Sequence, residues 1–427
     1  MNELTRLIKE DMRPALGVTE PGAIAFAVAK AKQYTQGEVK KVKVLLNSGM
    51  YKNAFTCGIP NSSRYGNLYA AALGAVAAKA ELGLESLAEI TPEDDEAAAQ
   101  MVAEGKVEAL LDHIGSEITI DATVETERDC ATVHIRGGHT NITSIEKNGE
   151  CVFEAECAVT GHDGTAEEDV PVIHRYSLED ILTYVKEVST EEIAFIRDAF
   201  AMNMELLEEG LASERAVIAA QLLCENGNER VSEDILKTAQ LFCNGAIEAR
   251  VLGLSRPAMS ITGSGAHGII ATMPLYAYHK VTKAADDDML LRATALSYLI
   301  TMYIKEYSGK LSAFCGCGIA AGTGMACGLA LMQGANDEQI HKVILNMSSG
   351  LTGMICDGGN HGCAMKGIVA TDAAFRASAL ALKDVCIAGI HGINGMTAED
   401  TMRHMGLIAS PGMVQTEKTI VEIMEQK

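Results

Sequence analysis

Residues 118–125, ITIDATVE, and residues 142–155, ITSIEKNGECVFEA, decide the fold class of this chain. In the first stretch, apolar and polar residues alternate, which is the pattern of a strand with one buried face. In the second stretch, Asn148-Gly149 separates two short runs and favours a two-residue hairpin turn. We therefore predict an antiparallel sheet between Ile118 and Glu156.

The sequence before this sheet mixes helical and strand patterns. Its expected elements are an amphipathic helix to about Pro14, an Ala-rich helix over 21–32, a strand over 39–46 and a small-residue helix over 68–84.

The sequence after the sheet is helical. Ser177 followed by Asp180 resembles a helix N-cap with an acidic first turn, and helical spacing continues to the end of the chain. We predict an α+β protein with two domains: a mixed α/β lobe carrying the antiparallel sheet over 1–175, for substrate binding or regulation, and a mainly α-helical domain over 176–427.

Composition excludes several classes of protein. The 427 residues are 48% hydrophobic, and the formal net charge of −22 would repel a nucleic-acid backbone. No apolar run reaches the ~20 residues that a membrane span needs, and the N-terminus has no signal-peptide pattern. We expect a soluble cytoplasmic protein without nucleic-acid or membrane partners. In a reducing cytosol, its 12 cysteines would stay free thiols.

Two glycine-rich segments carry the cysteines with the clearest chemical pattern. Residues 312–322 read SAFCGCGIAAG and residues 353–363 read GMICDGGNHGC, which contribute Cys315, Cys317, Cys356 and Cys363. Neighbouring glycines let a bulky inorganic group approach closely. Thiolates are the ligands of iron–sulfur centres, and three of them on a cubane leave one iron open to substrate. The segments predict an iron–sulfur site.

Two alternatives remain open for these cysteines. Any one of them could be a buried structural thiol. Four together could close a tetrahedral zinc site, although neither C-x-C nor C-x₆-C matches the usual C-x₂₋₄-C spacing.

A third glycine-rich segment, residues 260–268, reads SITGSGAHG. By letter it fits the G-x-G-x-x-G of dinucleotide sites, with Asp286–Asp288 at about the distance of the ribose-binding acid. Pro274 and the lack of a clear second strand speak against that reading. Backbone N–H groups and hydroxyls at a helix start also suit a small anion. We predict that an amino-acid carboxylate binds at Thr262, Gly263, Ser264 and Gly265.

Three side chains are candidates for proton transfer. His267 lies in that loop, His361 lies between two cysteines, and Glu20 lies in the turn GVTEP. Thr19 of the same turn and Asn61 of the loop IPNSS are expected to contact the substrate, because such loops beside helix starts often hold ligands.

Two further residues, His139 and Lys366, have weaker signals. We interpret His139, near a strand edge, as structural. Lys366 could carry a pyridoxal phosphate Schiff base, but nothing around it is specific to that cofactor.

Taken together, these motifs resemble the serine dehydratase α-chain-like family, and in particular its L-cysteine desulfidase branch. The likeness covers nearly the whole chain. The stretches that carry it are SAFCGCGIAAGTG, GMICDGGNHGCAMK, TGSGAHG, GVTEPGAIA and NSGMYKN with IPNSSRYGN.

The resemblance implies a serine dehydratase alpha-like helical domain and a [4Fe–4S] cluster. The cluster would be held by Cys356, Cys363 and one of Cys315 and Cys317. It also implies a lyase of amino-acid catabolism that forms pyruvate, ammonia and sulfide or water, with the substrate carboxylate at Thr262–Gly265. The partner is then a small amino acid, and Ala/Gly-rich helical faces favour a homodimer.

Two departures from the family pattern bear on activity. Desulfidases usually have Gly-Cys-Thr-Glu-Pro where this chain has Val18 in place of the cysteine, and Asn-Gln or Asn-His where it has Ala266-His267. An alternative function is therefore a non-catalytic iron–sulfur amino-acid sensor that lost its turnover together with the thiol that Val18 replaces.

Overall fold

A computed structural model describes residues 1–155, 170–283, 286–309 and 311–427. Its strands are β1 (Arg13–Leu16), β2 (Val39–Asn47), β3 (Val107–His113), β4 (Thr119–Thr126), β5 (Cys130–Arg136), β6 (Ile142–Lys147), β7 (Glu150–Glu154) and β8 (Pro257–Ser260).

The α-helices are α1 (Glu3–Asp11), α2 (Thr19–Lys32), α3 (Ser48–Ala54), α4 (Asn67–Val76), α5 (Pro92–Ala103), α6 (Leu178–Glu187), α7 (Arg197–Ala212), α8 (Val217–Glu225), α9 (Ile235–Val251), α10 (Gly265–Thr282), α11 (Asp287–Ser308), α12 (Gly322–Met332), α13 (Asp337–Leu351), α14 (Gly362–Ala381), α15 (Ala398–Leu407) and α16 (Val414–Met424). Short 3₁₀ or π segments are η1 (Ala80–Glu85), η2 (Val172–Arg175), η3 (Ala194–Ile196), η4 (Cys317–Ala321) and η5 (Ile408–Gly412).

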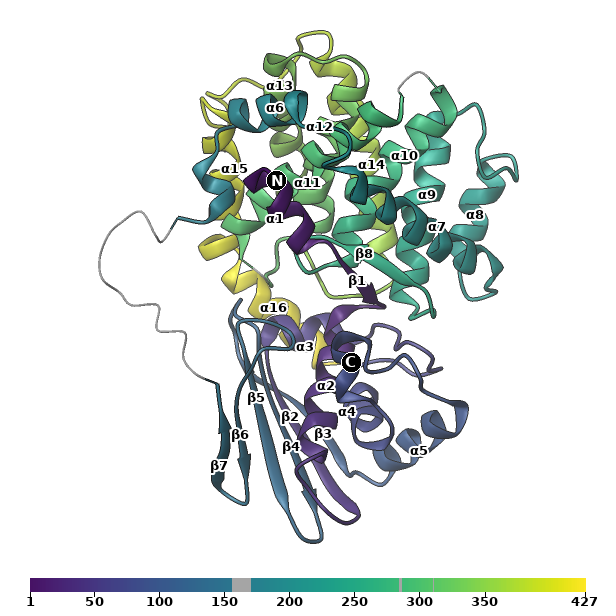
Figure 1. Cartoon of the computed structure of the whole chain (residues 1–427), viewed down its shortest axis with the longest axis vertical. Coiled ribbons are helices and arrows are strands. Elements are labelled where there is room, and N and C mark those ends of the chain that lie inside the picture. Colours follow the sequence, from purple (N-terminus) through teal and green to yellow (C-terminus); the bar gives the residue numbers. More distant parts are fainter. Residues whose placement is uncertain (156–169, 284–285, 310) are drawn as a thin grey trace.

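The chain forms a sheet-bearing part and a helical part, one above the other in Figure 1. Segments near both ends of the chain connect the two parts. Strand β1 pairs antiparallel with β8, which brings the first residues onto the helical part, while α16 packs against α3 of the sheet-bearing part. The α+β prediction is confirmed. The proposed boundary at residue 175 stays a prediction.

The main sheet has the strand order β3-β2-β4-β5-β6-β7. Strands β4 to β7 pair antiparallel, which confirms the prediction for the described part of 118–156. The sheet as a whole is mixed, because β3, before that range, pairs parallel with β2. Buried residues alternate along β4 and β5, and α2 packs against both strands. The predicted hairpin is confirmed: β6 and β7 pair through Asn148 and Gly149, both of which have positive φ. The predicted sheet end at Glu156 lies outside the described residues.

Two local predictions had different outcomes. The cap at Ser177 is confirmed, since its hydroxyl accepts the Asp180 N–H and the Asp180 carboxylate accepts the Ser177 N–H. The helix predicted over 68–84 is wrong in length. It ends at Val76, and the 3₁₀ segment η1 follows with Gly83 at a φ of 57°.

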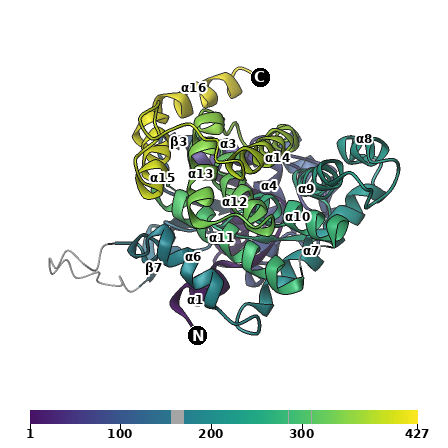
Figure 2. The same ribbon diagram turned by 90° about the horizontal axis from the view of Figure 1, so that it is seen from above.

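Helix α12 occupies the centre of the helical part, with α10, α11, α13 and α14 around it (Figure 2). The helices approach closely because α12 carries small residues. A Cβ on Gly324 would lie 2.2 Å from the Ser297 carbonyl oxygen of α11. None of the helices in the described part of the chain is both long and apolar enough for a membrane span.

Replacing Gly324 with alanine should therefore lower the free energy of unfolding by about 1–3 kcal/mol through overpacking. The matched control is Gly350→Ala in α13, where an added Cβ meets nothing within 4 Å. At position 350 the higher helix propensity of alanine should raise the free energy of unfolding by roughly 0.5–1 kcal/mol. Urea unfolding followed by circular dichroism measures both, and equal effects would contradict the packing argument.

Candidate active site

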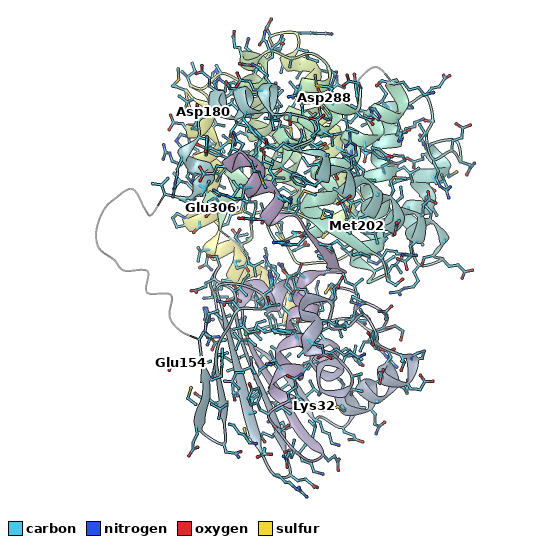
Figure 3. The ribbon with its side chains drawn as sticks, viewed as in Figure 1. Lys32, Glu154, Asp180, Met202, Asp288 and Glu306 are labelled. Carbon is cyan, nitrogen blue, oxygen red and sulfur yellow. The ribbon has the colours of Figure 1, made fainter. Side chains whose placement is uncertain are left out.

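One cavity of about 730 Å³ collects residues from both parts of the chain. Its wall includes the start of α2, the loop after β5, the end of α9, the loop before α10, the end of α11 and both cysteine segments. Glu306, on this wall, is labelled in Figure 3 near the junction of the two parts. The cavity is therefore a product of the tertiary structure and not of any one segment.

The two cysteine segments lie side by side. Phe314 and Ile355 form an isolated antiparallel bridge, the Cys315 N–H donates to the Met354 carbonyl at 3.1 Å, and the Cys356 N–H donates to the Ala313 carbonyl at 2.6 Å. Backbone pairing thus brings together thiols that are about forty positions apart in the sequence.

Three of the four cysteines line the cavity: Cys317, Cys356 and Cys363. Cys315 is not part of the lining and is 3% exposed. A hydrogen bond from the Cys317 thiol lowers the pKa of Cys315 to about 7, and the same contact raises the pKa of Cys317. Burial raises the pKa of Cys363 to about 11. Across the described ranges, no three Cys, His, Asp or Glu side chains are grouped to hold a metal ion.

Lysines surround these thiols. Lys305 lines the cavity, and burial lowers its pKa while Cys317 and Cys356 oppose that shift. Lys366 pairs with Asp357 and acts on Cys363 against the effect of burial. Positive charge at this wall favours thiolates and any anionic group bound to them.

The glycine-rich loop also contributes to the cavity wall. Thr262, Gly263 and Ser264 line the cavity, and the Thr19 hydroxyl donates to the Gly263 carbonyl at 3.4 Å. The backbone N–H of Thr262 donates to the Asp11 carboxylate, so this N–H is not available to a ligand. The dinucleotide reading fails here, because β8 is a four-residue strand paired antiparallel with β1.

His267 lies between this loop and the first cysteine segment. The Thr262 hydroxyl donates to the Ile261 carbonyl at 2.7 Å, so it accepts from His267 Nδ1 at 2.5 Å. In the neutral ring, Nε2 is then the proton acceptor, and it lies where a Cβ on Gly316 would come within 2.6 Å. Burial, together with Lys305 and Arg250, lowers the pKa of His267 well below its ordinary value.

Glu20 provides a second basic group, 6% exposed, on the cavity wall. The Asn53 side-chain amide donates to Glu20 Oε1 at 2.8 Å, and Asn53 Oδ1 accepts from the Cys356 thiol at 3.9 Å. His139 Nε2 lies 3.9 Å from the Glu20 carboxylate. Burial raises the pKa of Glu20, but His139 and Asn53 outweigh this effect and the net pKa lies below its ordinary value. Glu20 is therefore ionised at neutral pH.

Comparison with known proteins shows the family of this chain. Residues 81–422 match the family model described as serine dehydratase alpha chain. The chain belongs to this family. The four cysteines and the glycine-rich loop lie inside the matched range, whereas Thr19, Glu20 and Asn53 precede it.

Relatives match over the whole chain. A UPF0597 protein of Clostridium botulinum (strain Langeland) is 41% identical over 425 residues, 99% of this chain and 98% of that protein. A UPF0597 protein of Caldanaerobacter subterraneus is 36% identical, over 99% of this chain and 98% of that protein. One of Clostridioides difficile (strain 630) is 33% identical, over 98% of each.

Asn61 and His361, predicted for the site from their loops, lie away from the cavity wall. The Asn61 amide donates to the Leu87 and Ala88 carbonyls at 3.1 and 2.9 Å and is absent from the cavity wall. His361 is an exposed residue at the start of α14, also outside the wall. Their sequence neighbours suggested a ligand role, but the Asn61 side chain links its loop to the distant Leu87–Ala88 segment, and His361 is exposed to solvent.

Several cavity residues were missed by sequence reasoning. His139, interpreted as structural, lies beside Glu20, and Asn53, Lys305 and Arg250 had not been singled out. A sequence signal existed only for Arg250 and Lys305, each of which ends a mainly apolar helical stretch, LFCNGAIEAR and ALSYLITMYIK.

Proposed function

We propose that this protein is an iron–sulfur-dependent lyase that eliminates the β-substituent of a small amino acid, L-cysteine or L-serine. The observation that carries the proposal is the shared cavity. It presents three cysteines, a helix-starting glycine loop and two basic side chains, His267 and Glu20, to one space. Membership of the serine dehydratase alpha chain family supports the same reaction class.

The donor set on the cavity wall fits an iron–sulfur cluster. Cys317, Cys356 and Cys363 would hold it, and Cys317 is preferred over Cys315 because Cys315 does not reach the wall. Cluster thiolates bind different iron atoms, so they surround a bulky group and need not converge on one ion as in a zinc site. When bound, the cluster supplies an open iron that acts as a Lewis acid toward the leaving group.

The side chains of this protein provide the proton transfer. Nε2 of neutral His267 accepts the α-proton of the amino acid, because its Nδ1 is already engaged with Thr262. Ionised Glu20, held by Asn53, binds the α-ammonium group. As the α-proton and the β-substituent leave, aminoacrylate forms. After its release, tautomerisation and addition of one water give pyruvate and ammonia.

The first experiment is purification without oxygen, followed by iron, sulfide and zinc analysis and an absorption spectrum. We expect about four irons per chain and pyruvate from L-cysteine or L-serine. Colourless protein with stoichiometric zinc, or iron-loaded protein that forms no pyruvate from either amino acid, would overturn the proposed lyase.

Val18 favours a second candidate function, a non-catalytic amino-acid sensor. Its side chain lines the cavity, and a Cβ on Gly359 would lie 2.9 Å from it. The cysteine that desulfidases usually have at this position is therefore absent from the cavity wall of this protein. Activity in the unmodified protein excludes the sensor. If the unmodified protein is inactive, Val18→Cys should restore pyruvate formation from L-cysteine, with Val18→Ala as the control for side-chain size.

A further inference from the structure

Arg250, in the last turn of α9, is a buried cation on the cavity wall. It is 5% exposed, and its Nε is buried without a hydrogen-bond partner. Among the residues that the structure describes, no acidic side chain lies within 4.0 Å of its guanidinium. A charge removed from water without a counter-ion is unfavourable. This arginine therefore lacks the anionic partner that its burial calls for.

The acidic side chains nearest in the sequence and in the cavity are engaged elsewhere. Glu248, on the same helix, accepts the N–H groups of Ile218 and Ala219 at 3.0 and 2.7 Å. Glu20 accepts from Asn53 and acts on Arg250 only through space. The carbonyl end of α9 favours a cation at this position. It does not supply a bidentate acceptor for the guanidinium.

The Arg250 side chain lies across Gly265, the first residue of α10. A Cβ on Gly265 would come within 2.7 Å of Arg250 Nε and 3.1 Å of its Cδ. The first N–H groups of an α-helix have no intrahelical acceptor, and α10 is 18 residues long. The start of α10 carries no side-chain cap. A buried guanidinium and an uncapped helix start therefore meet at one point of the wall.

We propose that Arg250 and the N–H groups that open α10 together form the carboxylate site of this cavity, with Arg250 as its main specificity-determining residue. The ligand class is the α-carboxylate of a small amino acid, and that part of the proposal rests on the proposed function. Guanidinium and carboxylate match as a planar bidentate pair. A carboxylate bound there has Ser264 and His267 within the same stretch of wall.

The test measures binding of L-alanine to the full chain, purified without oxygen, by isothermal titration calorimetry. L-Alanine has no β-leaving group, so it cannot be turned over. L-Alaninamide, which lacks the carboxylate charge, is the ligand control. We expect the unmodified protein to bind L-alanine and to discriminate against the amide. Arg250→Met should weaken L-alanine binding at least about thirtyfold, because it removes one partner of a buried charge pair.

Arg256→Met is the matched control, since Arg256 is exposed and pairs with Glu205 at 3.5 Å away from this cavity. Its L-alanine affinity should equal that of the unmodified protein. If Arg250→Met does not fold, Arg250→Lys keeps the positive charge but not the planar fork, and should still bind about tenfold more weakly.

Two results overturn the proposal: unchanged L-alanine affinity in the Arg250 variants, or no L-alanine binding by the unmodified protein. The outcome is independent of turnover. Arg250-dependent binding without pyruvate from any substrate would leave the carboxylate site standing and the lyase disproved. Pyruvate formation with a KM that Arg250→Lys leaves unchanged would support the lyase and disprove the carboxylate site.

Discussion

Replacing Lys52 with methionine is expected to lower the free energy of unfolding by about 3–5 kcal/mol, because it leaves a buried carboxylate without its partner. Lys52 is 1% exposed, and its Nζ donates to Glu417 at 2.8 Å. The same Nζ donates to the carbonyls of Ser312 and Cys356 at 3.0 and 2.9 Å. One buried ammonium group thus joins α3, both cysteine segments and α16.

The control for this prediction is Lys186→Met. The Lys186–Asp337 pair has side chains 53% and 50% exposed, and such surface pairs contribute about 0–1 kcal/mol. The double variant Lys52→Met/Glu417→Leu should recover part of the lost stability, because no unpaired charge remains. Urea unfolding followed by circular dichroism measures all four proteins. A loss below about 1 kcal/mol in Lys52→Met would contradict a stabilising role.

Replacing Cys356 or Cys363 with alanine is expected to remove bound iron and to lower pyruvate formation about a thousandfold. A Lewis-acidic iron is worth several kcal/mol of transition-state stabilisation, and each ~1.4 kcal/mol is a factor of ten in rate. Cys224→Ala is the control, because Cys224 is exposed on α8. Iron analysis of anaerobic protein and a pyruvate assay give the two readouts.

The two neighbouring cysteines, Cys315 and Cys317, are expected to differ in their effect on bound iron. Cys317 lines the cavity and Cys315 does not, so Cys317→Ala should lose iron while Cys315→Ala keeps most of it. Iron retained in Cys317→Ala and lost in Cys315→Ala would reverse the assignment. Iron retained in all four variants would remove the cysteines from the proposed cluster altogether.

Predictions that depended on neighbouring residues were the most successful. The Asn148-Gly149 hairpin, the Ser177 cap and the strand over 39–46 all follow from interactions within a few positions. The local sequence determines such interactions, because turn geometry and capping involve only adjacent backbone groups. The helix over 68–84 was overextended because propensity alone does not indicate where packing ends a helix.

Predictions that needed distant residues were incomplete. No local pattern indicated the parallel strand β3 beside β2, and none indicated that Lys52 would join both cysteine segments. Asn61 and His361 were chosen for their sequence neighbours, yet neither reaches the cavity wall. Which side of a loop a side chain occupies depends on the elements that pack against that loop.

By itself, the sequence determined the α+β class, the family, and the two cysteine segments and glycine-rich loop that contribute to the cavity wall. Only the tertiary structure decided that Cys317 and not Cys315 lines the cavity, and that Arg250, Asn53 and His139 share it with Glu20 and His267. The physical reason is that motifs are local in the chain, whereas a cavity wall is built by backbone pairing and helix packing between residues up to hundreds of positions apart.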